Sequence, residues 1–198
     1  GGLTDIYLDG CDIVCSAGVK LSRLCAFALE NSLSGLEFAY GIPGTCGGAV
    51  FMNAGAYGKE MCDVVIKVCA LDNKGNTREF DLNECGFSYR HSAFEDNGYI
   101  VLGAVLKLTK DSADKCLALA RETMSKRVEK QPLDKPSCGS TFKRPEGYFA
   151  GKLIQDAHLS GKTIGGACVS PKHCGFVVNN GGAATKDVLD LMRLVRQE

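Results

Sequence analysis

The sequence predicts an α+β fold built from two consecutive units. Its 198 residues are 45% apolar and 23% charged, which is typical of a globular protein with one sizeable core or two small ones. Short β-like runs and helical periodicities occur in both halves, without an internal repeat or a low-complexity tract. A long helical pattern that stops before Pro132 follows the first group of elements, so we place the domain boundary near Lys110.

The first unit is expected to consist mainly of strands. Runs rich in β-branched residues indicate strands, and the turn residues Asp72 to Gly75 join two of them into a hairpin. Apolar positions from Leu21 to Leu29 recur every three or four residues, which indicates a helix that ends near Asn31. We expect strands at 6–8 and 13–15, a helix at 21–29, a hairpin of strands at 64–71 and 77–80, and a strand at 99–108 covered on both faces.

The second unit begins with a long helix. Asp111 and Ser112 can cap this helix, and it must end before Pro132 because proline cannot donate to the helical ladder. Its expected apolar face consists of Leu117, Ala120, Met124 and Val128. Beyond it we expect a strand at 139–142, a helix at 149–157, strands at 164–169 and 175–178, and a helix from Thr185 with Val188, Leu189, Met192 and Val195 on one face.

Charge and hydropathy exclude several classes of partner. Lysine plus arginine and aspartate plus glutamate both count 23, and no basic run occurs, so nucleic acid is a poor candidate partner. The apolar stretches are shorter than the roughly 20 residues that cross a bilayer, and no signal peptide is recognisable. We therefore expect a cytoplasmic protein that binds neither nucleic acid nor a membrane.

The eleven cysteines are expected to be reduced. Their number is odd and no Cys-x-x-Cys pair occurs, so neither a disulfide framework nor a zinc ribbon is indicated. The nearest candidates for soft metal ligands are Cys11 with Cys15, and Cys168 with Cys174 around His173. We expect mostly buried thiols that act as small apolar side chains, and no metal site.

Residues 41–58 form a glycine-rich segment. Six glycines among eighteen positions, with hardly any charge, are typical of a backbone that turns with positive φ or approaches a ligand closely. Free N–H groups in such turns can bind an anion such as a pyrophosphate. The segment matches neither the dinucleotide fingerprint nor the Walker pattern, which excludes a Rossmann or P-loop site. A tight turn without any ligand stays open as an alternative.

Two further segments carry polar side chains suited to ligand binding. In residues 86–92, Arg90 offers a planar fork of donors that can hold a carboxylate, although an arginine in a solvated loop is an alternative. In residues 136–145, Ser140 follows a glycine and could present its hydroxyl to a ligand, or could hydrogen-bond the backbone instead. The Gly-x-Ser-x-Gly elbow is missing and only three histidines occur, so a hydrolase triad is not indicated.

Taken together, the ordered motifs resemble the UDP-N-acetylenolpyruvoylglucosamine reductase family. The resemblance spans essentially the whole chain. It rests on residues 35–37 with 41–58, Tyr89-Arg90-x-Ser92-x-Phe94, Lys130-Gln131-Pro132 leading to Gly139-Ser140-x-Phe142-Lys143-Arg144-Pro145, residues 150–154, and His173-x-Gly175-Phe176-Val177-Val178-Asn179 followed by residues 182–187.

The resemblance implies a flavin-dependent oxidoreductase of peptidoglycan synthesis, and hence of cell wall biogenesis, cell shape and cell division. In this family NADPH reduces FAD, and the enolpyruvyl ether of UDP-N-acetylglucosamine is then reduced to UDP-N-acetylmuramate. The implied fold is the second half of a PCMH-type FAD-binding domain at residues 1–110, followed by a small α+β substrate-binding domain at 111–198. A monomer is expected.

Site residues carry over from the matched motifs. Ser140 matches the family's proton donor at C2 of the substrate, helped by cations such as Lys152 or Lys143, and Arg90 matches the residue that grips the carboxylate and stabilises enolate-like charge. Tyr89, Lys130, Lys152 and Asn179 match positions near the UDP-sugar. Backbone groups around Gly44 to Gly48 should face the pyrophosphate, and those around Asn53 to Gly55 the flavin ring. The positions expected around FAD are Gly41, Ile42, Pro43, Gly44, Thr45, Gly47, Gly48, Asn53, Ala54, Gly55 and Tyr57.

The chain departs from the family pattern at both ends. A preceding subdomain with a Gly-Ser-Asn phosphate loop, and a closing segment with a third catalytic glutamate, are expected outside these residues, and Glu198 does not match that glutamate. The short passage from Phe94 to Tyr99, together with Arg144, resembles the branch of the family that lacks an extra tyrosine loop. Because the preceding subdomain would bury much of the FAD, the alternative is a redox-inactive fragment that binds only a UDP-sugar.

Overall fold

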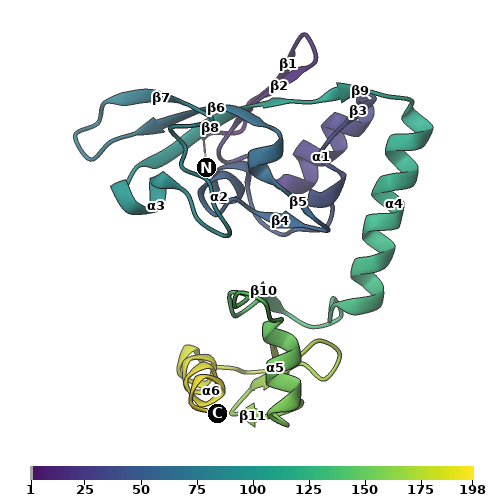
Figure 1. Cartoon of the computed structure of the whole chain (residues 1–198), viewed down its shortest axis with the longest axis vertical. Helices are drawn as coiled ribbons and strands as arrows, with labels where there is room; N and C mark the ends of the chain where they lie inside the picture. Colours follow the sequence, from purple (N-terminus) through teal and green to yellow (C-terminus); the bar gives the residue numbers. More distant parts are fainter. Residues whose placement is uncertain (1) are drawn as a thin grey trace. The chain divides into compact units, whose positions relative to one another are not determined.

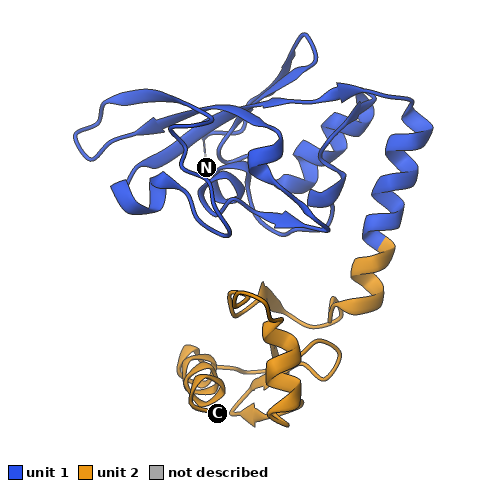
Figure 2. Ribbon diagram, viewed as in Figure 1, with its two compact units in different colours: residues 1–124 blue, residues 125–198 orange. Residues whose placement is uncertain are grey.

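The structure of the chain, a computed structural model, describes residues 2–198 and divides into two compact units (Figures 1 and 2). Unit 1 ends at Met124, and unit 2 runs from Ser125 to Glu198. The division lies inside helix α4 (Ala113–Lys130), whereas the sequence places the boundary near Lys110, before this helix. The mixture of helices and antiparallel sheets is the α+β class that the sequence predicts.

Unit 1 is organised around a five-stranded antiparallel sheet with the strand order β1-β2-β8-β6-β7. These strands are β1 (Ile6–Asp9), β2 (Asp12–Ser16), β6 (Val65–Leu71), β7 (Thr77–Asp81) and β8 (Ile100–Lys107). The helices are α1 (Leu21–Glu30), α2 (Cys46–Phe51), α3 (Ala93–Asn97) and the 3-10 turns η1 (Glu37–Ala39) and η2 (Met61–Asp63). Two small ladders complete the unit: β3 (Leu33–Ser34) with β9 (Thr109–Lys110), and β4 (Gly55–Ala56) with β5 (Lys59–Glu60).

One hydrophobic core lies between this sheet and the helices α1 and α2, which cover one of its faces (Figure 1). Side chains alternate along β2, so Ile13 and Cys15 are buried while their neighbours are half-buried. Phe94 is fully buried and contacts Phe80 edge-on, with ring centroids 5.1 Å apart. The buried residues of α1 follow the helical spacing that predicted it: Leu21, Leu24, Cys25 and Ala28.

Strand β8 differs from its predicted pattern. The sequence suggests a strand covered on both faces, yet Ile100 is 61% exposed whereas Val101 is buried. The pairing with β6 shifts, because Gly103 lies opposite Cys69 while Val101 lies opposite Ala70. The extra residue on β8 is a bulge that reverses the inward and outward alternation at the start of the strand.

Unit 2 contains a four-stranded antiparallel sheet with the order β10-β13-β12-β11. Its elements are β10 (Ser137–Ser140), α5 (Ala150–Asp156), β11 (Thr163–Ile164), β12 (Ala167–Val169), β13 (Phe176–Asn179) and α6 (Thr185–Gln197). The predicted strand segment at 164–169 is broken by a turn at Gly165, whose φ is +53°. A core of its own holds the unit together and consists of Ile154, Leu159, Ala167, Val169, Cys174, Val177 and Leu191.

The apolar faces predicted for α4 and α6 are partly wrong. Met124 and Val128 are exposed, and Cys116 and Ala120 are the buried apolar residues of α4. The two ends of α4 belong to different units, so a continuous apolar stripe is not buried against one core. In α6 the buried position is Leu191, flanked by the partly buried residues Val188, Leu194 and Val195, whereas Leu189 is exposed.

All eleven cysteines are free thiols, and seven of them are buried. Within residues 2–198, no group of three or more His, Cys, Asp or Glu side chains is arranged to hold a metal ion. Among the helices of the described residues, none combines the length and the apolar character needed to cross a bilayer.

Candidate functional site

The glycine-rich segment, residues 41–58, contains helix α2 (Cys46–Phe51). Gly44 has a φ of +137°, and the Oγ1 of Thr45 caps the helix by accepting a hydrogen bond from the Gly48 N–H at 3.3 Å. The Gly47 N–H donates to the carbonyl of Ala17 at 2.9 Å. The N–H groups of Gly47 and Gly48, which the resemblance places toward a pyrophosphate, therefore already have partners within the protein.

An open groove of about 510 Å³ lies beside this segment, within the size range of small-molecule sites. A Cβ at Gly48 would meet only the Oγ1 of Thr45, at 3.6 Å, so Gly48 leaves open space along the groove. A Cβ at Gly47 would lie 2.6 Å from the Cβ of Ala17, so packing requires glycine there. The lining residues are Gly2, Leu3, Ala17, Gly18, Thr45, Gly47, Gly48, Phe51, Tyr99, Ile100 and Val101.

Arg90 contacts the end of the same glycine-rich segment. Its Nη1 donates to the carbonyl of Asn53 at 3.2 Å, and its Nη2 donates to the carbonyl of Gly55 at 2.5 Å. Nη1 also pairs with Oε1 of Glu60 at 3.2 Å, and the side chains of both residues are about a quarter to a third exposed (27% and 30%). Arg90 has a φ of +54°, and its guanidinium lies 4.9 Å from the ring centroid of the exposed Tyr89. Arg90 is therefore held inside a network, which excludes the alternative of an arginine in a solvated loop.

Asn53 joins the two loops that form this network. It is fully buried at a φ of +42°, a left-handed conformation that asparagine tolerates better than most residues. Its Nδ2 donates to Oε2 of Glu60 and to the carbonyl of Ser88, both at 2.9 Å, and its Oδ1 accepts from the Cys62 N–H at 3.0 Å. The side chain of Asn53, predicted to lie among cofactor-binding positions, is used entirely to hold the protein together.

The other predicted cofactor positions differ in their surroundings. The carbonyls of Asn53 and Gly55 accept from Arg90, and the Ala54 N–H donates to the carbonyl of Ala49 at 2.8 Å, so these backbone groups already have protein partners. Tyr57 is 47% exposed at a φ of +55°. Thr45, Gly47 and Gly48 line the groove, whereas the lining does not include Gly41, Ile42, Pro43 and Gly44.

Ser140 lies at the end of β10 in unit 2. It is exposed and pairs with Phe176 of β13, after Gly139 at a φ of +84°. Within residues 2–198 the Ser140 hydroxyl makes no hydrogen bond, so the alternative role of capping the backbone is not observed. The neighbouring Thr141 takes that role, because its Oγ1 accepts from the Val177 N–H at 3.1 Å.

The remaining predicted substrate positions also belong to unit 2. Lys130 is the exposed last residue of α4, and Lys152 of α5 forms an exposed ion pair with Asp156. Asn179 ends β13, and its Oδ1 accepts from the N–H groups of Gly181 at 2.8 Å and Ala183 at 3.2 Å. Asn179 therefore shapes the turn before α6 with its side-chain oxygen.

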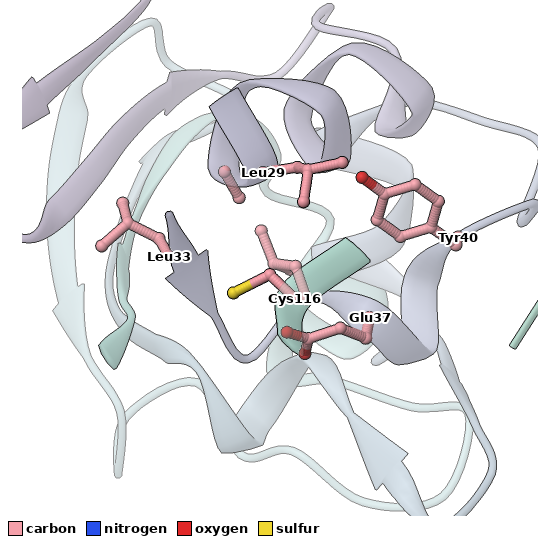
Figure 3. Close-up of a pocket in the computed structure, with 7 residues that line it drawn as sticks. Leu29, Leu33, Glu37, Tyr40 and Cys116 are labelled. Carbon is pink, nitrogen blue, oxygen red and sulfur yellow. The ribbon is translucent and has the colours of Figure 1, made fainter. Parts of the chain in front are cut away.

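A second cavity in unit 1 is too small for a cofactor or a sugar (Figure 3). Its volume is about 10 Å³, the space of about one water molecule. Oε1 of Glu37 is buried there without a hydrogen-bond partner among the described residues. Burial raises the pKa of Tyr40 to about 12, and burial also raises the pKa of the Cys116 thiol. Leu29 and Leu33 supply apolar walls. The cavity is a small packing defect beside α4.

Two side-chain contacts, one within the Arg90 network and one beside it, are not apparent from the sequence. Glu60 supplies the carboxylate, and the buried Ser92 donates from its Oγ to the carbonyl of Phe51 at 2.7 Å. These contacts join residues 30 or more positions apart, so no local pattern reveals them. Ser92 belongs to the motif Tyr89-Arg90-x-Ser92-x-Phe94, whereas nothing in the sequence indicates that Glu60 is a partner of Arg90.

Two known protein families match this chain, one in each unit. A family described as FAD binding domain matches residues 3–81, and the family described as UDP-N-acetylenolpyruvoylglucosamine reductase, C-terminal domain, matches residues 131–198. A crystal structure of UDP-N-acetylenolpyruvylglucosamine reductase from Thermus caldophilus is similar with a TM-score of 0.91 and 38% identity, covering 100% of this chain and 72% of that one.

Curated proteins with similar sequences are also named UDP-N-acetylenolpyruvoylglucosamine reductase. The UDP-N-acetylenolpyruvoylglucosamine reductase of Agathobacter rectalis is 55% identical over 190 residues, which cover 96% of this chain and 60% of the relative. The protein of that name from Alkaliphilus oremlandii is 50% identical over 191 residues, which cover 96% of this chain and 63% of the relative. The chain thus spans less than two thirds of the length of these relatives.

Proposed function

Since the chain belongs to the UDP-N-acetylenolpyruvoylglucosamine reductase family, we propose that the protein containing it reduces UDP-N-acetylglucosamine enolpyruvate to UDP-N-acetylmuramate, with electrons from NADPH and a bound FAD. The observation that carries the proposal is the ordered match of an FAD-binding domain to residues 3–81 and of a reductase C-terminal domain to residues 131–198. The protein would act as a monomer in peptidoglycan precursor synthesis in the cytoplasm.

The groove of unit 1 has surroundings that fit a flavin dinucleotide. Gly48 leaves space along it, and Phe51 and Ile100 offer apolar surface to a flat ring system. The residues that would hold FAD there are Thr45, Gly48 and Phe51. Bound FAD would supply hydride transfer, a reaction that amino-acid side chains do not perform.

Arg90 would bind the carboxylate of the enolpyruvyl group. A guanidinium can hold a carboxylate through two parallel hydrogen bonds, and its charge stabilises negative charge that develops next to that carboxylate during reduction. The contacts of Arg90 with Asn53, Gly55 and Glu60 fix the guanidinium before substrate binds. A donor that is already oriented adds little reorganisation cost to the transition state.

Ser140 would deliver the proton to C2 of the substrate. Its hydroxyl is exposed and is not engaged by the described residues, so it can donate to a ligand. An alcohol is a weak acid, and transfer from it requires nearby positive charge and a strongly basic carbon as acceptor. Lys143 and Lys152 are the lysines of unit 2 proposed to supply this charge.

The proposal is tested with the purified full-length protein. We expect a bound yellow chromophore and oxidation of NADPH that depends on the enolpyruvyl UDP-sugar. A protein without flavin and without substrate-dependent NADPH oxidation contradicts the proposal. Calorimetric binding of UDP-sugars in the absence of any NADPH oxidation would instead support the redox-inactive alternative.

A further inference from the structure

We propose that Glu60 is the positioning residue for Arg90: it holds the guanidinium so that the remaining donor edge faces the substrate carboxylate. This inference rests on the proposed function for the identity of the substrate. Its structural basis lies wholly within unit 1, in the contacts among the loop residues 53–62 and 88–92.

Both oxygens of the Glu60 carboxylate serve donors. Oε1 accepts from Nη1 of Arg90 at 3.2 Å, and Oε2 accepts from Nδ2 of Asn53 at 2.9 Å. Only a carboxylate offers acceptors at both positions, because an amide would turn an NH₂ group toward one of the two donors. The residue type at position 60 is therefore specified by its two partners.

The stem and backbone of Glu60 are fixed as well. The Glu60 N–H donates to Oδ2 of Asp63 at 2.8 Å, and Glu60 pairs with Gly55 across the β4–β5 ladder. A Cβ at Gly55 would lie 2.6 Å from the Cγ of Glu60, so the glycine allows the Glu60 side chain to pass close to the backbone. The backbone of Glu60 is therefore fixed at the point from which its side chain extends to Arg90.

These contacts leave one edge of Arg90 available. Nη1 donates to Asn53 and Glu60, and one N–H of Nη2 donates to Gly55. Nε and the second N–H of Nη2 have no hydrogen-bond partner within residues 2–198. Nε and Nη2 form the side-on edge of a guanidinium, which holds a carboxylate through two parallel hydrogen bonds. We assign the donor to Gly55 to the Nη1 side of Nη2, so that the edge formed by Nε and Nη2 is left for the carboxylate.

The decisive variant is Glu60→Gln in the flavin-loaded protein. It keeps the size of the side chain but removes the charge and one acceptor. We expect unchanged flavin content and unchanged flavin reduction by NADPH, together with about a tenfold rise in KM for the enolpyruvyl substrate. The control is Glu79→Gln, which removes the same charge from an exposed ion pair with Lys67 on the β6–β7 hairpin and should leave both half-reactions unchanged.

A double-mutant cycle tests whether Glu60 acts through Arg90. Arg90→Lys combined with Glu60→Gln should be no worse than Arg90→Lys alone, because the edge that Glu60 orients is already lost. Additive losses in the double variant overturn the inference. Equal loss of flavin reduction and of substrate reduction in Glu60→Gln also overturns it, since that result indicates a role in folding only.

Calorimetry supplies a readout that does not depend on turnover. Glu60→Gln should weaken binding of UDP-N-acetylmuramate, which carries the carboxylate, and leave binding of UDP-N-acetylglucosamine, which lacks it, unchanged. A wild-type protein without substrate-dependent NADPH oxidation contradicts the proposed function. Equal affinities of Glu60→Gln and wild type for the carboxylate ligand overturn the role of Glu60.

Discussion

Asn53→Ala is the substitution that most directly probes the network around Arg90. It removes three hydrogen bonds, two from Nδ2 to Glu60 and Ser88 and one from Cys62 to Oδ1, with lengths of 2.9, 2.9 and 3.0 Å. Each hydrogen bond contributes about 1 kcal/mol to the free energy of unfolding. Alanine at a φ of +42° adds about 1 kcal/mol of backbone strain relative to asparagine. We therefore expect unit 1 to lose about 3–5 kcal/mol of stability.

Urea unfolding followed by tyrosine fluorescence measures this loss. The chain has no tryptophan, and five of its six tyrosines lie in unit 1, so the signal reports mainly on that unit. Asn53→Gly is the matched control, because it removes the same hydrogen bonds but relieves the positive φ, and it should be about 1 kcal/mol less destabilising than Asn53→Ala. A loss below about 1 kcal/mol for Asn53→Ala, or a larger loss for Asn53→Gly, would refute the reasoning.

Three further predictions follow from the same structure. Gly47→Ala should destabilise unit 1, because its Cβ would lie 2.6 Å from that of Ala17. Gly48→Ala should leave the melting temperature nearly unchanged but lower the flavin content, because Gly48 lines the groove. The reverse pattern in thermal melts and absorbance spectra would contradict the groove assignment. Ser140→Ala should leave flavin reduction by NADPH unchanged and slow substrate-dependent reoxidation in stopped-flow experiments, and equal losses in both would exclude a role as acid. Burial raises the pKa of Tyr40 to about 12, above the ordinary tyrosine value of about 10. The neutral form of Tyr40 therefore contributes stability that is fully present below about pH 10 and is lost as the pH rises toward 12. An alkaline titration in which all six tyrosines ionise together near pH 10 would contradict this.

Local sequence patterns predict several of the regular elements of unit 1. The alternation around Ile13, the helical spacing after Leu21 and the turn at residues 72–75 each encode their element locally, and the structure confirms all three. Helix α2 was not predicted, because its sequence Cys-Gly-Gly-Ala-Val-Phe has low helix propensity. The Thr45 cap and the contacts of α2 with β8 override that propensity.

The bulge in β8 and the burial pattern of α4 escaped prediction for a related reason. Both depend on which neighbour an element pairs with, and that information is absent from the local pattern of apolar residues. Ile100 reads as a core residue by alternation, yet the shifted register with β6 exposes it.

Some contacts of the candidate site can be expected from the sequence and others cannot. Ordered motifs placed Arg90 and residues 53–55 in one site, and the structure brings them into direct contact. The N–H groups of Gly47 and Gly48 are engaged within the protein, because Gly47 donates to Ala17 and Gly48 to the capping Thr45. Glu60 could not be found from the sequence, since its relation to Arg90 exists only after the two loops have folded together.

The most direct test of the reductase function is an anaerobic titration of the full-length flavin-loaded protein. NADPH should bleach the flavin absorbance, and one equivalent of the enolpyruvyl UDP-sugar should then restore it while UDP-N-acetylmuramate forms. Flavin that stays bleached after addition of the UDP-sugar, or a protein that carries no flavin to bleach, would contradict the account.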